Sequence, residues 1–141
     1  DWSSDVCSSD LARLFPDYRK QEREFYQRTG FHPIMHTLVI REDLHKVHPW
    51  VAESLYKACE EAKRWALRQM RFSGAQRTML PWLYEEIAEM DALMGDNPWP
   101  YGVEANRKIL TAFMGYLEEQ HFIEKAAPIE DMFAPIVNWS E

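Results

Sequence analysis

Cysteine is scarce in this sequence, which contains two, Cys7 and Cys59, in 141 residues. Two cysteines are too few for a disulfide framework or for a structural zinc site. Long apolar runs are missing too: none approaches the roughly 18 residues that a membrane-spanning helix needs, so we expect no membrane insertion. Basic residues are outnumbered by acidic ones, 16 against 23. The formal charge of −7 argues against a nucleic-acid partner, because phosphate binding needs a basic face.

The first ten residues, DWSSDVCSSD, do not fit the rest of the chain. They have no hydrophobic period, and they lack the basic start and apolar middle of a signal peptide. Back-translated, they match a common sequencing-adaptor primer whose last bases run into the codon of Leu11. We therefore expect an artefactual leader at 1–11, natural sequence at 12–141, and a missing gene start, so that a targeting signal is not assessable. Without the three aspartates of this leader, the 23 acidic residues become 20 against 16 basic ones, a charge of about −4.

The remaining residues have a globular composition, with 46% apolar residues, six Trp and seven Met. Such a content predicts a substantial buried surface, part of which can belong to a contact with missing sequence. Apolar positions at helical spacing, together with Pro at first turns and Gly at ends, predict several helices. They are expected over 16–28, 49–74, 81–95, 104–119 and 129–133, with a turn or short helix at 41–47 and a loop at 96–102.

The segment 49–74 has the best helical pattern. Val51, Leu55, Ala62 and Trp65 recur on one face, which we expect to be buried. Glu60 and Arg64 would form an i,i+4 pair on the solvent side, and Cys59 would be a small packed side chain.

One strand is expected, at 34–40, where the sequence is short, β-branched and apolar on both faces. A lone strand cannot satisfy its backbone hydrogen bonds. Either it pairs with another molecule, or the rest of its sheet lies in a missing amino-terminal part. The predicted class is therefore α/β, although the chain as it stands would be mostly helical.

Several segments together resemble one family. They are LFPDY at 14–18, RTGFHPIMHTLVIR at 28–41, HPWV at 48–51, LYKA at 55–58, WPYGVEANR at 99–107 and EDMFAP at 130–135. In this order they resemble the last part of 4,5-dihydroxyphthalate decarboxylase-like proteins, and the likeness covers nearly everything after Leu11.

The resemblance implies a type II periplasmic-binding-protein fold, in which two α/β lobes enclose a ligand cleft. The chain would be the carboxyl-terminal portion, inactive by itself because half of the cleft is missing. The implied reaction is the non-oxidative loss of one carboxylate from 4,5-dihydroxyphthalate to give 3,4-dihydroxybenzoate. Transport proteins share this fold, so the alternative is the substrate-binding protein of an ABC-type transporter for a small carboxylate or aromatic compound.

Decarboxylation of an electron-rich ring needs a general acid, cations for the substrate carboxylates and a closed cleft, but no cofactor. His36 is the predicted acid, because it lies near the start of the strand and histidine titrates near neutral pH. The alternative is a hydrogen-bonded histidine with a structural role. Met35 and Arg41 border the same segment and are expected substrate contacts, although Arg41 can also be a plain surface charge.

A second group of expected substrate contacts is Trp99, Tyr101, Asn106 and Arg107. Arg107 can pair with a carboxylate through two hydrogen bonds, and the aromatic side chains can stack on a ring. The alternative is a loop that packs the following helix, with Arg107 capping or solvated. His32, His45, His48 and His121 share no ligand spacing, so no metal is predicted.

The expected partner is a small aromatic carboxylate. The location would be cytoplasmic for an enzyme and periplasmic for a transport protein, and the sequence indicates no oligomeric state.

Overall fold

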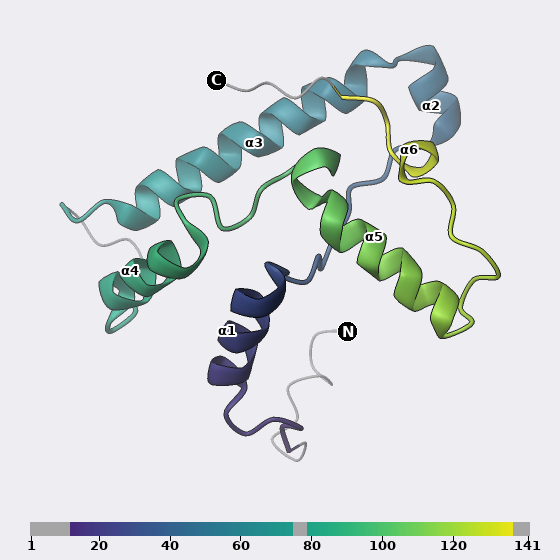
Figure 1. The fold of residues 1–141 in the computed structure, drawn as a ribbon. Helices are drawn as coiled ribbons and strands as arrows, with labels where there is room; N and C mark the ends of the chain where they lie inside the picture. The colour runs from purple at the N-terminus through teal and green to yellow at the C-terminus, as the bar shows by residue number, and fades with distance from the viewer. Residues whose placement is uncertain (1–11, 75–78, 137–141) are drawn as a thin grey trace. The chain divides into compact units, whose positions relative to one another are not determined.

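The computed structural model describes residues 12–74 and 79–136 (Figure 1). The predicted leader at 1–11 lies outside the described residues. The chain divides into two compact units, Asp1–His32 and Pro33–Glu141. All regular secondary structure in the described ranges is helical, which confirms the prediction of a mostly helical chain.

The first unit contains helix α1, Tyr18–Thr29. Its carboxyl end is closed by Gly30, whose backbone N–H donates to the Tyr26 carbonyl at 2.6 Å. Gly30 has a φ of 71°, a left-handed conformation that glycine adopts without a Cβ clash. Beyond it, the Phe31 ring meets the Phe25 ring edge to face, with centroids 6.4 Å apart. The helix predicted over 16–28 is therefore confirmed, with bounds that differ by one or two residues.

The prediction of a strand at 34–40 is wrong. Residues 30–41 carry no regular secondary structure, and the side chains of Met35, Leu38 and Val39 are exposed. A strand is defined by hydrogen bonds to a neighbour, and no strand occurs in the described ranges to supply them. The apolar, β-branched sequence is therefore insufficient by itself to form a sheet.

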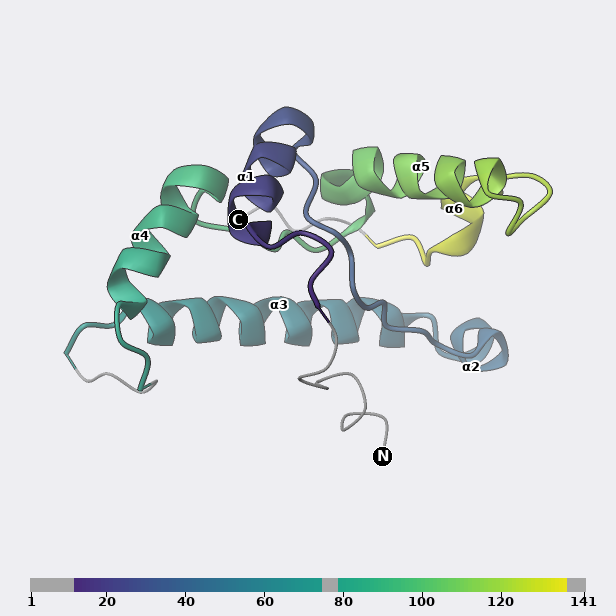
Figure 2. The ribbon, with the colours of Figure 1, turned by 90° about the horizontal axis from the view of Figure 1, so that it is seen from below.

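Within the described residues the second unit contains five helices, whose bounds differ from the predicted ones by at most a few residues. Figure 2 shows the longest, α3, as one unbroken helix. Acidic residues in the first turn and basic residues in the last turn of α2 and α3 complement the helix dipole. The bounds are α2 Glu42–Val47, α3 Trp50–Arg71, α4 Leu83–Met94, α5 Val103–Glu119 and α6 Ile129–Met132.

The burial predicted for the long helix is wrong, although its helical period is right. In α3, Trp65 is 55% exposed and Leu55 is 37% exposed, Ala62 is exposed, and Val51 is half-buried. The more enclosed side chains are Lys63 and Glu60, at 8% and 18% exposure. Contacts from the loop after α4 cover this polar side, whereas the described chain provides no comparable cover for the apolar side.

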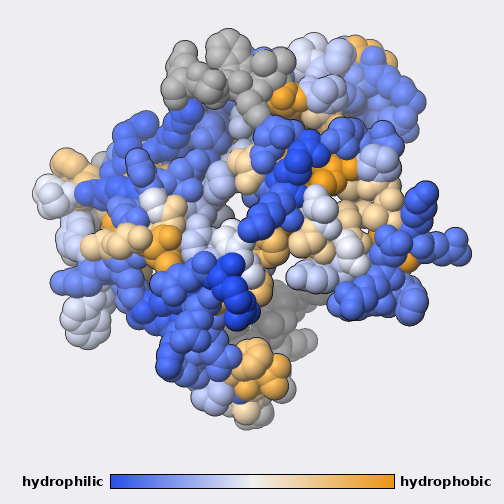
Figure 3. Space-filling view, in the orientation of Figure 1, coloured by the Kyte–Doolittle hydropathy of each residue, from blue (hydrophilic) through white to orange (hydrophobic). Residues whose placement is uncertain are grey.

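Few side chains are fully buried. Ala52, Ile87 and Ile129 are the buried apolar residues of the described chain, and no polar or charged residue there is buried. Figure 3 accordingly shows hydrophobic residues scattered among hydrophilic ones on the visible face. The substantial core that six Trp and seven Met predicted is not formed by the described residues alone.

Candidate functional site

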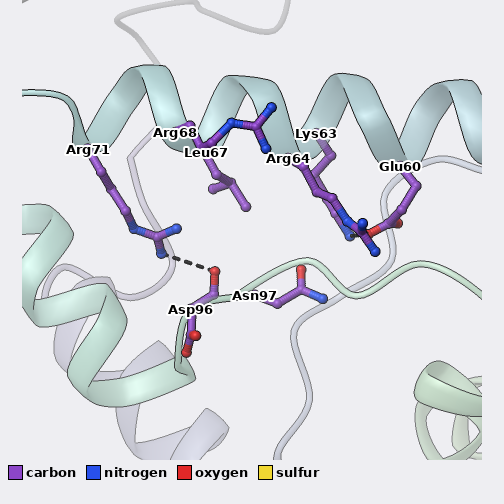
Figure 4. A pocket seen from close by; sticks show the side chains of 8 residues that line it. All are labelled: Glu60, Lys63, Arg64, Leu67, Arg68, Arg71, Asp96 and Asn97. Carbon is purple, nitrogen blue, oxygen red and sulfur yellow. Dashed lines mark hydrogen bonds and ion pairs between the residues drawn. The ribbon is translucent and has the colours of Figure 1, made fainter. Parts of the chain in front are cut away.

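The polar side of α3 borders an open hollow of about 410 Å³ (Figure 4). The α3 residues that line the hollow are at positions 60, 63, 64, 67, 68 and 71. This spacing of three and four residues places them on one face of the helix. The opposite rim is the beginning of the connection between α4 and α5. The lining consists of Glu60, Lys63, Arg64, Leu67, Arg68, Arg71, Asp96 and Asn97.

Lys63 fixes one end of this hollow. Its Nζ lies 2.8 Å from Glu60 Oε1 and donates to the Trp99 carbonyl at 3.0 Å. The same ammonium lies 4.2 Å from the centroid of the Tyr101 ring, within the range of a cation–π contact. One lysine therefore joins the middle of α3 to the loop that precedes α5.

Arg71 fixes the other end. Its Nη2 lies 2.5 Å from Asp91 Oδ1, its Nε donates to Asp91 Oδ2 at 3.2 Å, and Nη2 also donates to the Asp96 carbonyl at 3.1 Å. The hydrogen bonding with the Asp91 carboxylate raises the pKa of the Arg71 guanidinium. Figure 4 shows the bond to the Asp96 main chain, with the Asp96 carboxylate directed away from α3.

Arg64 and Arg68 lie between these ends and form fewer ion pairs and hydrogen bonds than Lys63 and Arg71. Arg64 Nε is 3.7 Å from Glu60 Oε1, which confirms the predicted i,i+4 pair. The solvent-side placement predicted for Glu60 is wrong, because its side chain is only 18% exposed. Glu60 Oε2 is buried and has no hydrogen-bond partner among the described residues. Arg68 forms no ion pair or hydrogen bond with any residue in the described ranges.

The structure brings two predicted contacts, Trp99 and Tyr101, together through Lys63. Asn106 lies nearby in sequence, and its Nδ2 donates to the carbonyls of Pro100 and Gly102 at 2.7 and 2.9 Å. These bonds hold the loop at the start of α5. In this structure the amide group of Asn106 therefore orders the backbone that carries the two aromatic residues.

Arg107 is held by two carboxylates. It forms two hydrogen bonds with Glu104, at 3.2 and 2.6 Å, and one with Glu130 of α6 at 2.7 Å. These bonds raise the pKa of Arg107 and lower that of Glu104. The pKa of Glu130 is also lowered, by its own backbone N–H and by Arg107. The guanidinium thus links α5 to α6.

The other predicted group lies in the segment before α2. His36 and Met35 are exposed, and no hydrogen bond or ion pair with another described residue is found for His36. Arg41 pairs with Asp43, which raises the pKa of Arg41 and lowers that of Asp43.

Metal ligation has no structural support in the described ranges, which contain no suitable group of three or more His, Cys, Asp or Glu side chains. His32 and His36 do have i,i+4 spacing, which the sequence interpretation overlooked, but residues 30–41 are not helical. No helix in the described ranges is long and apolar enough to cross a membrane.

Sequence reasoning missed the basic face of α3. The signal was present: Lys63, Arg64, Arg68 and Arg71 recur on the side of the helix that carries Glu60. Only Glu60 and Arg64 were interpreted, as a solvent-side pair, because the helix was oriented by its apolar residues. The loop contact that encloses Lys63 depends on positions 36 residues away and could not be inferred from spacing.

Comparison with known proteins indicates a distant relationship. No family model matches the chain. A 4,5-dihydroxyphthalate decarboxylase of Comamonas testosteroni is 31% identical to it over 122 residues, which make up 86% of this chain. They make up 37% of that relative, so the chain spans well under half of the relative's length. This likeness supports a related function. The segments at 28–41 and 99–107 are two of those on which the sequence analysis based its resemblance to the same family.

Proposed function

We propose that this chain is the carboxyl-terminal portion of a decarboxylase that acts on an aromatic dicarboxylate of the 4,5-dihydroxyphthalate type. The observation that carries the proposal is the 31% identity with a protein of that name over most of the chain. In the proposal, residues upstream supply the rest of a two-lobed fold and the other wall of the cleft.

The reaction needs little machinery. Each carboxylate of 4,5-dihydroxyphthalate is para to a hydroxyl group, which can feed electrons to the carbon that bears the carboxylate. A general acid gives its proton to that carbon, the bond to the carboxylate breaks with its electron pair returning to the ring, and carbon dioxide leaves. The acid then regains a proton from water. No redox step occurs, so no redox cofactor is required.

In this proposal His36 is the general acid, with Met35 and Arg41 beside the substrate. An exposed histidine is accessible to a ligand, and residues 30–41 carry no regular secondary structure that would make it part of a helix or a sheet. Trp99 and Tyr101 supply aromatic surface, positioned by Lys63 and Asn106. Arg107 is proposed as a carboxylate-binding residue, which requires it to exchange Glu104 or Glu130 for the substrate.

Carbon dioxide release tests the proposal. The whole protein, expressed from its intact gene, is incubated with 4,5-dihydroxyphthalate, and 3,4-dihydroxybenzoate and carbon dioxide are measured. Formation of both in equal amounts supports the decarboxylase. Tight binding of the dicarboxylate without carbon dioxide release would instead favour a solute-binding protein, and neither binding nor turnover would contradict both.

A further inference from the structure

One face of α3 is apolar and open to solvent. Leu55, Ala58, Ala62 and Trp65 follow one another at steps of three and four residues, which places them in one strip along the helix. All four are exposed, Leu55 by 37% and Trp65 by 55%. Apolar residues scattered singly are normal on a protein surface, whereas a continuous apolar strip marks a contact with another protein segment. These four residues form the apolar strip of α3.

The other side of α3 is already occupied. Lys63 donates to the Trp99 carbonyl at 3.0 Å and lies 4.2 Å from the centroid of the Tyr101 ring. Near the end of the helix, Arg71 is paired with Asp91 of α4. Both contacts come from the polar side, so they fix the rotation of α3 about its axis in the second unit. The apolar strip is therefore directed away from these partners.

The strip has a shape that suits close packing. Ala58 and Ala62 lie in its middle, one helical turn apart, and the larger side chains of Leu55 and Trp65 lie at its two ends. The distance between two packed helices depends on the size of the side chains at the contact, so two alanines allow a close approach. The strip therefore favours an apolar backbone element that crosses α3 at Ala58 and Ala62.

The length of the strip indicates what kind of partner covers it. The rise from Leu55 to Trp65 is about 15 Å. A strip of this length, one helix wide, can bury on the order of 300 Å², well below the roughly 800 Å² per partner of a stable complex between separate molecules. A segment of the same polypeptide needs less area, because it does not lose its translational and rotational freedom on contact.

The comparison with the decarboxylase shows that such a segment has room in the whole protein. The matched residues make up 37% of that relative, so most of its length lies outside the match. We propose that the apolar strip of α3 is the surface on which the upstream part of the same polypeptide packs. In the whole protein α3 is then enclosed from both sides, by the loop with Trp99 and Tyr101 and by an apolar element of the upstream part.

The inference rests on one part of the proposed function, namely that this chain is the carboxyl-terminal portion of a longer protein. It does not depend on the reaction. It also accounts for a feature of α3 that the described residues leave unexplained, which is the exposure of Leu55 and Trp65 in a helix whose pattern predicts their burial.

Hydroxyl-radical footprinting of the unmodified whole protein tests whether the strip is covered. Trp50 and Trp99 are matched controls, because they are the same residue type and are 64% and 51% exposed, close to the 55% of Trp65. Oxidation of each side chain is measured by mass spectrometry in the folded protein and normalised to its rate in urea. Trp65 should be oxidised at least about tenfold more slowly than the faster of the two controls.

Photo-crosslinking identifies what covers the strip. The whole protein is expressed with the photoreactive amino acid benzoylphenylalanine in place of Trp65, irradiated, and mapped by mass spectrometry. Crosslinks should form within one polypeptide and join position 65 to residues upstream of position 12. A second copy of the protein would instead give crosslinked dimers, and a cover within this chain would give crosslinks to residues 12–136.

The inference is overturned if Trp65 is oxidised as fast as the controls, or if no crosslink reaches the upstream part. Neither measurement uses carbon dioxide release, so the two proposals fail separately. A protein that binds the dicarboxylate without turnover but has a covered strip keeps the inference and loses the proposed enzyme. A decarboxylase whose Trp65 is exposed keeps the proposed function and loses the inference.

Discussion

Arg71 and Asp91 face each other across the end of α3 and the last part of α4, joined by two hydrogen bonds of 2.5 and 3.2 Å. The same guanidinium reaches the Asp96 carbonyl at 3.1 Å, just beyond Gly95, where α4 ends. This arrangement fixes where the chain leaves α4. It therefore also fixes one rim of the hollow, at Asp96 and Asn97.

Replacing either partner should reveal a real but modest coupling. Both side chains are partly exposed, at 28% and 37%, so solvent screening reduces the energy of the pair. A double-mutant cycle of Arg71→Gln and Asp91→Asn should give a coupling free energy of about 0.5–1 kcal/mol in urea unfolding. A coupling near zero would mean that the pair does not hold the two helices in solution.

The helices were predictable because their signals are local. Pro49 before α3 and Gly30 after α1 mark their ends in the sequence, and the structure places the boundaries within a few residues. The face that α3 covers was not predictable, because it depends on where the loop with Trp99 and Tyr101 returns. The strand at 34–40 failed for the same kind of reason, since a strand needs a partner that its own residues do not encode.

The candidate site was also predictable only in part. Trp99 and Tyr101 were selected from the sequence, and the structure gives them a common partner. That partner, Lys63, was missed because its contact with the loop joins positions 36 residues apart, which helical spacing does not reveal. The bonds of Asn106 to two nearby carbonyls are short-range, yet they depend on a loop conformation that residue types alone do not determine.

Ile87 should be the most informative position for the stability of the second unit. It is one of the few buried apolar side chains in the described chain, with 8% exposure on α4. Ile87→Ala should lower the free energy of unfolding by about 2 kcal/mol or more, through lost burial and a residual cavity. Val39→Ala, at a position that is 86% exposed, is the control and should change it by less than about 0.5 kcal/mol.

The ion pairs of Arg107 should make the contact between α5 and α6 sensitive to acid. The pKa values of Glu104 and Glu130 are held below their ordinary value of 4.5, so their ionised forms are favoured in the folded state. Their contribution is present above that value and is lost as the pH falls through the lowered folded pKa values. The free energies of unfolding of wild type and Arg107→Gln, measured in urea, should therefore differ at about pH 7 and converge as the pH falls below the lowered pKa values of both glutamates.

Arg107→Lys serves as the comparison for this experiment. Lysine keeps the charge but cannot form the same two hydrogen bonds with Glu104, so its stability should lie between the other two proteins. A difference between wild type and Arg107→Gln that stays constant from neutral to acidic pH would show that packing, rather than the ion pairs, is responsible.

His36 is the position on which the proposed chemistry depends. In the whole protein, His36→Ala should lower the turnover of 4,5-dihydroxyphthalate by about 10²–10⁴-fold, the usual contribution of a general acid, with a smaller effect on binding. His32→Ala removes a histidine four residues earlier and should leave turnover nearly unchanged. Added imidazole should partly restore the activity of His36→Ala, because a soluble acid can enter the space left by the side chain. Restoration would not occur if His36 only stabilised the segment, and unchanged turnover in His36→Ala would remove it from the mechanism.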